Sequence, residues 1–431
     1  MKIIAVVPAK GNSDRIPSKN SQLLDGKPLF INMLEKLVKC PSIDEVWLDT
    51  DSDQFIDIAS ELPIHIMKRE PQLASNTTDG NALFLNEVSH IDADIYLQVL
   101  CTSPFIEIQT IEDTLATLIS NPAYDSAVMV KKEKQYLWNN NQPSYDIEHI
   151  PNSVDLNDTI IETMGMYIMY RDNALTLKRR IGNNPYLIYA TPIEAIDVNW
   201  AEDFQLANLI AAGIREQENH LLQNISASIS SAILSDILDE LGYPNQVIKK
   251  LKPYTPTKIF GRAKTLKLRK KHQDESPAGI YNALNTYKYI VPNDIIVVEN
   301  EISDYAYFGE LNANLAIRAG AIGTIIDGAT RDSQNVANLN YPVFSKGYNC
   351  QDVKNRAVVE HFNKTITLDN VTVEPNCLIY ADNEGIVIVP QQVEHQVIER
   401  ALTLTRNERH ILNDISNDIH VDELVAKYGF F

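Results

Sequence analysis

The chain has 431 residues, of which 44% are hydrophobic and 22% charged, the balance of an ordinary globular protein with two or three domains. Its formal net charge is −19. Such a charge argues against nucleic acid or an anionic membrane as a partner for the whole surface. Small anionic substrates are not excluded, because a local cationic loop can still bind them.

The cysteines predict neither a zinc site nor a disulfide framework, because no two of them form a CxxC pair. They are Cys40, Cys101, Cys350 and Cys377. The first residues lack the pattern of a secretory signal, and no apolar stretch reaches membrane-spanning length. We therefore expect a cytoplasmic protein without a membrane or nucleic-acid partner.

The first half of the chain alternates short apolar runs with amphipathic segments. We expect strands at 3–7, 46–51 and 95–100 and a helix at 29–39. This alternation predicts an α/β fold with a largely parallel, doubly wound sheet. Ligands of such sheets bind beyond the carboxyl ends of the strands.

A cationic loop, residues 8–20, directly follows the first strand. It combines Gly11 and small polar residues with Lys10, Arg15 and Lys19. Backbone N–H groups and point charges in such a loop can both face an anion, so the segment predicts a phosphate site. The polar segments 49–51 and 102–104 follow the other two strands and should lie nearby.

The second half begins after a polar helix that runs from 201 to about 223. We divide the chain into a first domain at 1–215, a linker at 216–225 and a second domain at 226–431 with a helical C-terminal tail. The second domain opens with an amphipathic helix and resumes strand–helix alternation. We expect strands at 295–298 and 321–326, a helix at 311–319 and a hairpin within 378–390.

The spacing of Gly309-Glu310 and Arg331-Asp332 carries the chemistry of the second half. The helix and strand between them bring Arg331-Asp332 to a strand end. An Arg fork can bind a carboxylate, and an adjacent Asp can hold Mg²⁺ or Mn²⁺. Glu310 can order metal-bound waters, and the three together suit a 2-keto acid. Taken alone, an Arg-Asp pair is more often a surface turn or a structural ion pair.

Residues 1 to about 215 resemble the acylneuraminate cytidylyltransferases, which activate sialic-acid-like sugars as CMP conjugates. The matching stretches are 8–20, 46–52, 73–75, Gln98 with 102–104, 164–168, Ile196-Asp197 and Glu202-Asp203. The resemblance implies a nucleotidyltransferase, Rossmann-like fold with CTP and a 2-keto sugar acid as substrates and Mg²⁺ as cofactor. It assigns Lys19 to catalysis and Asp197 to the metal. The implied nucleotide contacts are Lys10, Gly11, Asn12, Ser13, Arg15, Lys19, Asn20 and Ser75, and the implied sugar contacts are Gln98, Thr102 and Ser103.

Several positions depart from that family's pattern. Asp14 stands where the family usually has Lys, Asn76 where it often has Asp, and Cys101 where it has Pro. Asn199 replaces the second of two metal-binding carboxylates. A member that keeps the fold and has lost activity, and an active enzyme with another sugar or metal arrangement, are therefore both open.

Residues from about 226 to 415 resemble the RraA-like family, which includes metal-dependent 4-hydroxy-4-methyl-2-oxoglutarate aldolases. The matching stretches are 236–238, 261–263, 307–311, 327–332, 342–344 and 382–387. The resemblance implies that Glu310 and Arg331 are catalytic, that Asp332 binds Mg²⁺ or Mn²⁺, and that pyruvate is a further substrate. It also implies a homo-oligomer, a trimer or hexamer. Because the family also contains ribonuclease regulators without known catalysis, a non-catalytic oligomerisation or regulatory module is the alternative.

Overall fold

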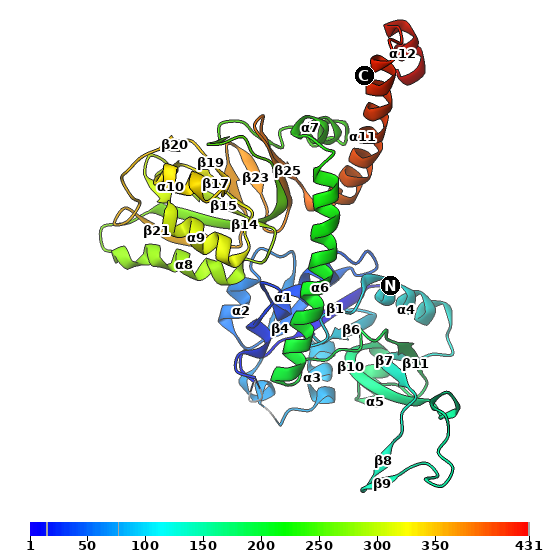
Figure 1. Ribbon diagram of the computed structural model, residues 1–431. Helices are drawn as coiled ribbons and strands as arrows, with labels where there is room; N and C mark the ends of the chain where they lie inside the picture. Colours follow the sequence, from blue (N-terminus) through cyan, green and yellow to red (C-terminus); the bar gives the residue numbers. More distant parts are fainter. Residues whose placement is uncertain (14–15, 76, 430–431) are drawn as a thin grey trace. The chain divides into compact units, whose positions relative to one another are not determined.

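The computed structural model of the chain describes residues 1–13, 16–75 and 77–429. The chain divides into two compact units, unit 1 (Met1–Ala211) and unit 2 (Ala212–Phe431). The division falls within helix α6 (Ala201–Ser226), so the segment 216–225 is helical (Figure 1). Both units are α/β, which confirms the predicted fold class.

The main sheet of unit 1 has the strand order β11-β7-β10-β6-β1-β4-β5. The strands are β1 (Ile3–Pro8), β4 (Glu45–Thr50), β5 (His65–Lys68), β6 (Ile95–Val99), β7 (Ser126–Glu133), β10 (Thr159–Tyr170) and β11 (Pro185–Tyr189). Only β10 runs antiparallel to its neighbours among these described strands. The sheet is therefore largely parallel, as the sequence predicts. Short hairpins pair β2 (Leu23–Leu24) with β3 (Lys27–Pro28) and β8 (Trp138–Asn139) with β9 (Gln142–Pro143).

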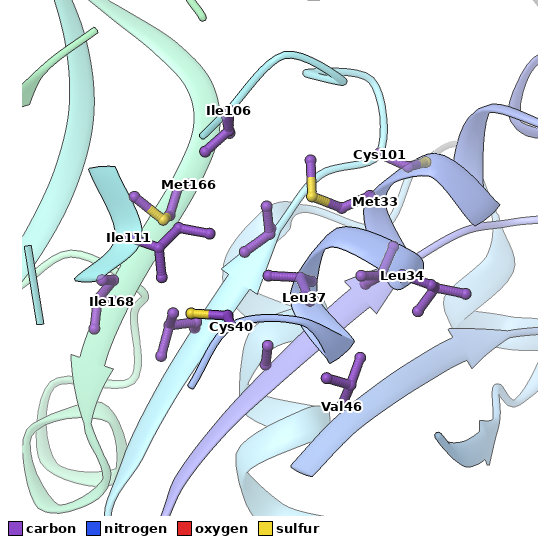
Figure 2. Packing of buried hydrophobic residues seen from close by; sticks show 14 of the residues in the cluster. Met33, Leu34, Leu37, Cys40, Val46, Cys101, Ile106, Ile111, Met166 and Ile168 are labelled. Carbon is purple, nitrogen blue, oxygen red and sulfur yellow. The ribbon is translucent and has the colours of Figure 1, made fainter. Parts of the chain in front are cut away.

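Helices cover both faces of this sheet. Helices α1 (Leu29–Val38), α2 (Asp53–Ile58) and α4 (Ile108–Ser120) pack on one face, and α3 (Gly80–His90) and α5 (Arg171–Leu177) on the other. The spacing of Met33, Leu34 and Leu37 puts these side chains on the buried side of α1, as Figure 2 shows. Full burial of such side chains contributes about 1.5–3 kcal/mol each to folding.

The main sheet of unit 2 has the order β12-β25-β24-β14-β15-β17-β19-β13, with β21 also paired to β14. Its strands are β12 (Val247–Ile248), β13 (Lys252–Pro253), β14 (Ile259–Lys270), β15 (Asp294–Asn300), β17 (Gly323–Asp327), β19 (Val343–Ser345), β21 (Ala357–Phe362), β24 (Leu378–Ala381) and β25 (Ile386–Val389). Strands β14, β15, β17 and β19 are parallel, and β24 and β25 form the predicted hairpin. A separate small sheet joins β16 (Ala306–Phe308), β18 (Ala329–Thr330) and β20 (Gly347–Tyr348).

Three clusters of apolar side chains cover the main sheet of unit 2. The first includes α8 (Ala283–Thr286), α9 (Glu310–Ala319) and α10 (Ser333–Asn338). The second includes the hairpin of β22 (Ile366–Leu368) and β23 (Val371–Val373). The third joins the end of α6 to α7 (Ser231–Glu240) and α11 (Glu394–Ser416), after which α12 (Val421–Tyr428) follows.

Short 3-10 helices complete the connections: η1 (Lys19–Ser21), η2 (Pro71–Ala74), η3 (Ser153–Asp155), η4 (Pro277–Asn282), η5 (Tyr287–Tyr289) and η6 (Gln391–Val393). Within the described ranges, no single helix is both long and apolar enough to cross a membrane. Helices α6 and α7 meet that test only as a pair, bent by 100°.

Candidate active sites

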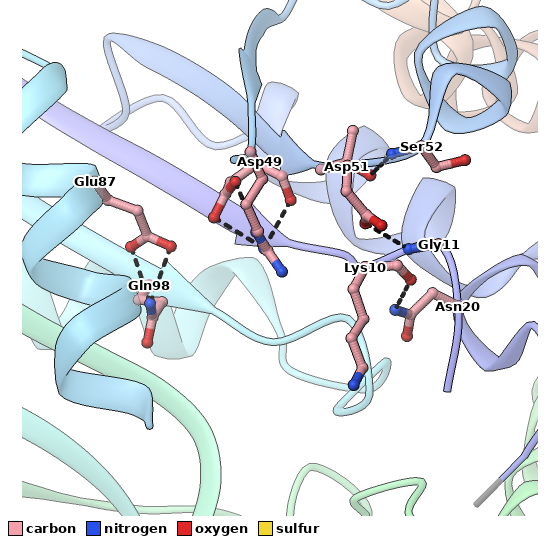
Figure 3. A network of polar contacts seen from close by, with 10 residues as sticks. Lys10, Gly11, Asn20, Asp49, Asp51, Ser52, Glu87 and Gln98 are labelled. Carbon is pink, nitrogen blue, oxygen red and sulfur yellow. Dashed lines mark hydrogen bonds and ion pairs between the residues drawn. The ribbon is translucent and has the colours of Figure 1, made fainter. Parts of the chain in front are cut away.

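The loop after β1 is fastened to the end of β4. The N–H of Gly11 donates to the Asp51 carboxylate at 2.8 Å, and the side-chain amide of Asn20 donates to the Lys10 carbonyl oxygen at 3.0 Å (Figure 3). A Cβ atom at Gly11 would lie 2.9 Å from Cβ of Ser52, so the loop passes too close to the segment after β4 for a larger residue. The structure thus places Lys10, Gly11 and Asn20 together beyond the carboxyl ends of β1 and β4.

The rest of this loop is only partly described. Asn12 Oδ1 accepts the Ser13 N–H at 2.9 Å. Arg15, predicted to bind the nucleotide, and the departures Asp14 and Asn76 lie outside the described residues.

Lys19 and Asn20 join this loop to two distant segments. Lys19 is only 7% exposed, and its Nζ donates to the Val198 carbonyl oxygen at 2.9 Å. Asn20 Oδ1 accepts the thiol of Cys101 at 3.4 Å. Burial raises the pKa of Cys101 to about 12, so this thiol remains a proton donor. Cys101, which stands where the resemblance predicts Pro, therefore contributes a side-chain hydrogen bond to this loop.

Asp197 has one carboxylate oxygen that a cation could use. Its Oδ2 accepts the side-chain amide of Asn199. Its Oδ1 is buried and has no hydrogen-bond partner among the described residues. A buried carboxylate oxygen without a partner is costly, and a hard divalent cation would satisfy it. Asp197 therefore fits a divalent cation such as magnesium, which would supply positive charge at this end of the sheet.

Gln98 belongs to a buried polar network that the sequence did not predict. Its Nε2 donates to both Glu87 oxygens at 3.0 and 2.9 Å, and Gln98 is 1% exposed (Figure 3). Asp49 receives two bonds from Arg69, at 2.9 and 2.8 Å. Burial, with the nearby Asp49 charge, raises the pKa of Glu87 well above its usual value. Burial also raises the pKa of Asp49, although its ion pair with Arg69 acts in the opposite direction.

The carbonyl end of Gln98 is also occupied. Its Oε1 accepts Arg180 Nη1 at 3.3 Å, and Arg180 Nη2 donates to the hydroxyl of Tyr167 at 2.8 Å. Tyr167 in turn donates to Glu162. Arg180 and Tyr167 are candidate site residues to which the sequence analysis gave no role, although Tyr167 lies in the matched stretch 164–168 and the charge of Arg180 was visible in the sequence.

The remaining predicted contacts of unit 1 differ in their placement. The Val198 N–H donates to the carbonyl oxygen of Thr102 at 2.8 Å, so Thr102 lies beside Asp197. The Ser103 hydroxyl is buried and lacks a partner within the described structure. Ser75 is exposed and pairs with Thr77 and Thr78, at 2.9 and 3.0 Å. An open pocket of about 340 Å³ is formed mainly by residues that come shortly before Ser75 in the chain. It is lined by Asp51, Lys68, Arg69, Glu70, Pro71 and Ala74.

In unit 2, Glu310 and Asp332 meet at Gly309. Glu310 begins α9 directly after β16, and its N–H donates to Asp332 Oδ2 at 3.2 Å. A Cβ at Gly309 would lie 2.5 Å from the same oxygen. Asp332 itself has a φ of 54°, a left-handed conformation that costs a non-glycine residue about 1 kcal/mol or more. The backbone of Asp332 is therefore strained, and its carboxylate lies so close to Gly309 that a Cβ there would displace it.

Arg331 completes the predicted group of unit 2. Its Nη2 lies 2.7 Å from Asp352 Oδ2, and its Nε lies 3.9 Å from Asp332 Oδ2. The Glu310 carboxylate accepts the side-chain amide of Asn335 at 2.7 Å. Sequence reasoning missed Asp352, because its place depends on the pairing of its segment with Ala306. Within the described chain, no three His, Cys, Asp or Glu side chains form a metal site, so a cation here would rely on Asp332.

These features define a two-domain α/β protein with one candidate site beyond the strand ends of a doubly wound sheet and another beside a small three-stranded sheet. Residues 4–180 match the cytidylyltransferase family, and residues 231–388 match the family described as Aldolase/RraA. The chain therefore carries a cytidylyltransferase domain followed by an RraA-like domain, which confirms both resemblances.

Relatives of the chain include two proteins named for the activation of sialic-acid-like sugars and one whose name states no activity. Protein DlpA of Legionella pneumophila is 26% identical over 213 residues, 49% of this chain and 34% of DlpA. CMP-N,N'-diacetyllegionaminic acid synthase of the same organism is 33% identical over 117 residues, 26% of this chain and 50% of the synthase. N-acylneuraminate cytidylyltransferase of Escherichia coli is 23% identical over 323 residues, 72% of this chain and 73% of that enzyme. The chain thus spans a third of the first of these relatives and half of the second.

Proposed function

We propose that unit 1 transfers CMP from CTP to a 2-keto-3-deoxy sugar acid of the sialic-acid kind. The observation that carries this proposal is the convergence of Lys19, Asn20 and the unpartnered oxygen of Asp197 on one site. The cytidylyltransferase match supports CTP as the donor. The names of the legionaminic acid synthase and the acylneuraminate enzyme support the class of acceptor.

The reaction joins the acceptor's 2-hydroxyl oxygen to the α-phosphorus of CTP. The bond from that phosphorus to the bridging oxygen breaks, pyrophosphate leaves, and the hydroxyl proton is released. Such catalysis depends mainly on positioning and on neutralising phosphate charge. Lys10 and Lys19 supply cations, and Asp197 would hold a magnesium ion, which neutralises phosphate charge when bound.

Pyrophosphate release from CTP tests this function, with a panel of nonulosonic and octulosonic acids as acceptors and magnesium present. We expect release with at least one acid, and no release when ATP, GTP or UTP replaces CTP. The proposal would be refuted if no acid led to pyrophosphate release and calorimetry detected no binding of CTP.

For unit 2 we propose a metal-dependent lyase that acts on a 2-keto acid. The observation that favours it is Arg331 set beside Asp332 and Glu310, with Asp332 in a strained conformation. Arg331 would bind the carboxylate, and Asp332 would hold a divalent cation, which polarises the keto group when bound. In the cleavage, the 4-hydroxyl loses its proton, the C3–C4 bond breaks, and its electron pair forms an enolate that takes a proton at C3. Because sialic-acid-like sugars are formally pyruvate joined to an aldehyde, this chemistry suits the same substrates as unit 1.

Proton NMR of pyruvate in heavy water, with the full chain and Mn²⁺ or Mg²⁺, tests the lyase. We expect the methyl protons to exchange for deuterium, and the Arg331→Ala variant to abolish that exchange. No exchange with either metal, and no cleavage of any sugar acid, would instead indicate a non-catalytic oligomerisation or regulatory module.

A further inference from the structure

Arg180 is a half-buried cation whose partners are all neutral. Its Cζ lies 3.7 Å from the centroid of the Tyr167 ring, and its two Nη atoms donate to Tyr167 and Gln98. No carboxylate in the described part of the chain forms an ion pair with it. Other charged side chains of this region differ: Arg69 is paired with Asp49, and Lys68 with Asp53. Arg180 therefore keeps its charge and some of its N–H groups for a ligand.

The position of the guanidinium is fixed from several sides. A Cβ at Gly80 would lie 2.6 Å from Nη1, so the start of α3 approaches the group as closely as glycine allows. The backbone N–H of Arg180 donates to Asn81 Oδ1 at 3.1 Å. Gln98 cannot turn, because Glu87 holds its amide nitrogen. A cation stacked on an aromatic ring and held by hydrogen bonds is preorganised for a planar oxyanion.

Tyr167 and Arg180 border the site that contains Lys19 and Asp197. Tyr167 is opposite Gln98 in the β10–β6 register, and Gln98 precedes Cys101 by three residues on the same strand and its end. The pKa of the Tyr167 hydroxyl is raised by burial and by Glu162, and the Asp197 charge also acts on it. The same Asp197 charge acts on Cys101, which contacts Asn20. The backbone connects these segments as well: the Leu100 N–H donates to the Gly165 carbonyl oxygen at 2.9 Å, two residues before Tyr167, and the Thr102 carbonyl oxygen accepts the N–H of Val198, the residue after Asp197, at 2.8 Å.

We infer that Arg180 binds the carboxylate of the acceptor acid, with Gln98 and Glu87 as positioning residues. The inference rests on the function proposed for unit 1 and adds the residue that selects an acid over a neutral sugar. Lys10 and Lys19 lie on the cationic loop (residues 8–20), which the proposed function assigns to the triphosphate. Arg180 comes from a different segment, after α5, and its fork matches the two oxygens of a carboxylate.

Steady-state kinetics of Arg180→Met and Arg180→Lys test this assignment, with Arg179→Met as the matched control. Arg179 donates instead to Gly182 and Asn183. We expect KM for the acceptor acid to rise roughly 10- to 100-fold in Arg180→Met, because the variant loses a charge-assisted hydrogen bond to the carboxylate. Arg180→Lys should recover part of the loss, and KM for CTP should stay within about threefold in all three variants. A rise in KM for CTP with an unchanged acceptor KM would overturn the inference and assign Arg180 to the triphosphate.

The carboxamide analogue of the acceptor distinguishes recognition of charge from a structural role. The wild-type protein should prefer the acid strongly, whereas Arg180→Met should treat acid and amide alike. A variant that keeps the wild-type preference would refute the inference.

Calorimetric binding of the sugar acid, without CTP, separates this inference from the proposed reaction. If the wild-type protein binds the acid, Arg180→Met does not, and no pyrophosphate is released from CTP, the transferase proposal fails while the carboxylate site stands. Equal binding of the acid by both proteins would refute the site, whatever the transferase does.

Discussion

Lys19 Nζ donates a 2.9 Å hydrogen bond to the carbonyl oxygen of Val198, a residue 179 positions further along the chain. The contact joins the loop after β1 to the residue that follows Asp197. Because Lys19 is almost fully buried, its ammonium group requires polar partners, and the Val198 carbonyl oxygen is one of them. This hydrogen bond therefore connects a lysine of the cationic loop (residues 8–20) to the backbone beside Asp197, the candidate metal ligand.

Replacing Lys19 by Met should abolish most transferase activity, because the substitution removes a phosphate-neutralising charge and releases the backbone at Val198. The loss of one such group costs roughly 100- to 1000-fold in rate. Pyrophosphate release at saturating CTP measures it. Lys39→Met, at an exposed lysine after α1, serves as the control and should retain the wild-type rate. Near-normal turnover in Lys19→Met would contradict a role for Lys19 in the reaction.

Changing Asn199 to Asp should lower the magnesium concentration needed for half-maximal activity by roughly tenfold, since a second carboxylate beside Asp197 attracts the cation more strongly. Asp197→Asn should have the opposite effect and reduce the rate. A titration of pyrophosphate release with MgCl₂ measures both. If the magnesium dependence is the same in all three proteins, these residues do not hold the metal.

Gly309→Ala should disable unit 2 without altering a charged group, because the added Cβ would lie 2.5 Å from Asp332 Oδ2. The backbone of Gly309 is extended, so alanine is not strained there. Deuterium exchange of pyruvate should fall at least tenfold, while the melting temperature changes little. Gly213→Ala is the matched control, because no atom lies within 4 Å of a Cβ at that position.

Arg262→Met should destabilise unit 2 by roughly 2–3 kcal/mol, since it leaves two partly buried carboxylates without a cation. Arg262 donates to Glu218 of α6 and Glu394 of α11, and to the Asn376 carbonyl oxygen at 2.9 Å. Urea unfolding measures the change. Arg318→Met, at an exposed arginine of α9, should shift the free energy of unfolding by no more than about 0.5 kcal/mol.

Asp294 should make stability depend on pH between about 4 and 6. Burial raises its pKa from 3.8 to about 6, although Lys264, 3.8 Å away, acts in the opposite direction. The folded state then holds a proton that the unfolded state has lost, so the stabilising contribution of Asp294 is present below pH 4 and is lost as pH rises through 6. The shift corresponds to about 3 kcal/mol.

Urea unfolding of the wild-type protein and Asp294→Asn at pH 4, 5, 6 and 7 checks this prediction. The free energy of unfolding of the wild type should fall relative to that of the variant over this range. A constant difference between the two proteins would show that Asp294 has an ordinary pKa.

The sequence by itself determined the α/β class of both halves and most element positions. Apolar runs such as 3–7 and 295–298 form buried strands, and the spacing of Met33, Leu34 and Leu37 forms a buried helix face. These signals are local, because side-chain periodicity follows directly from helix and strand geometry. The sequence also identified two motifs as partners, because the one helix and one strand between them fix their separation. These motifs are Gly309-Glu310 and Arg331-Asp332.

Only the tertiary structure decided which side chains share a site. Gln98 reads as a ligand contact in the sequence, yet in the fold both ends of its amide are held by Glu87 and Arg180. Arg180 reaches Gln98 because β10 pairs beside β6 and α3 begins with a glycine. Asp352 reaches Arg331 through one backbone pairing. Strand order and close approach of backbones arise from long-range packing, and no local pattern of residues encodes them.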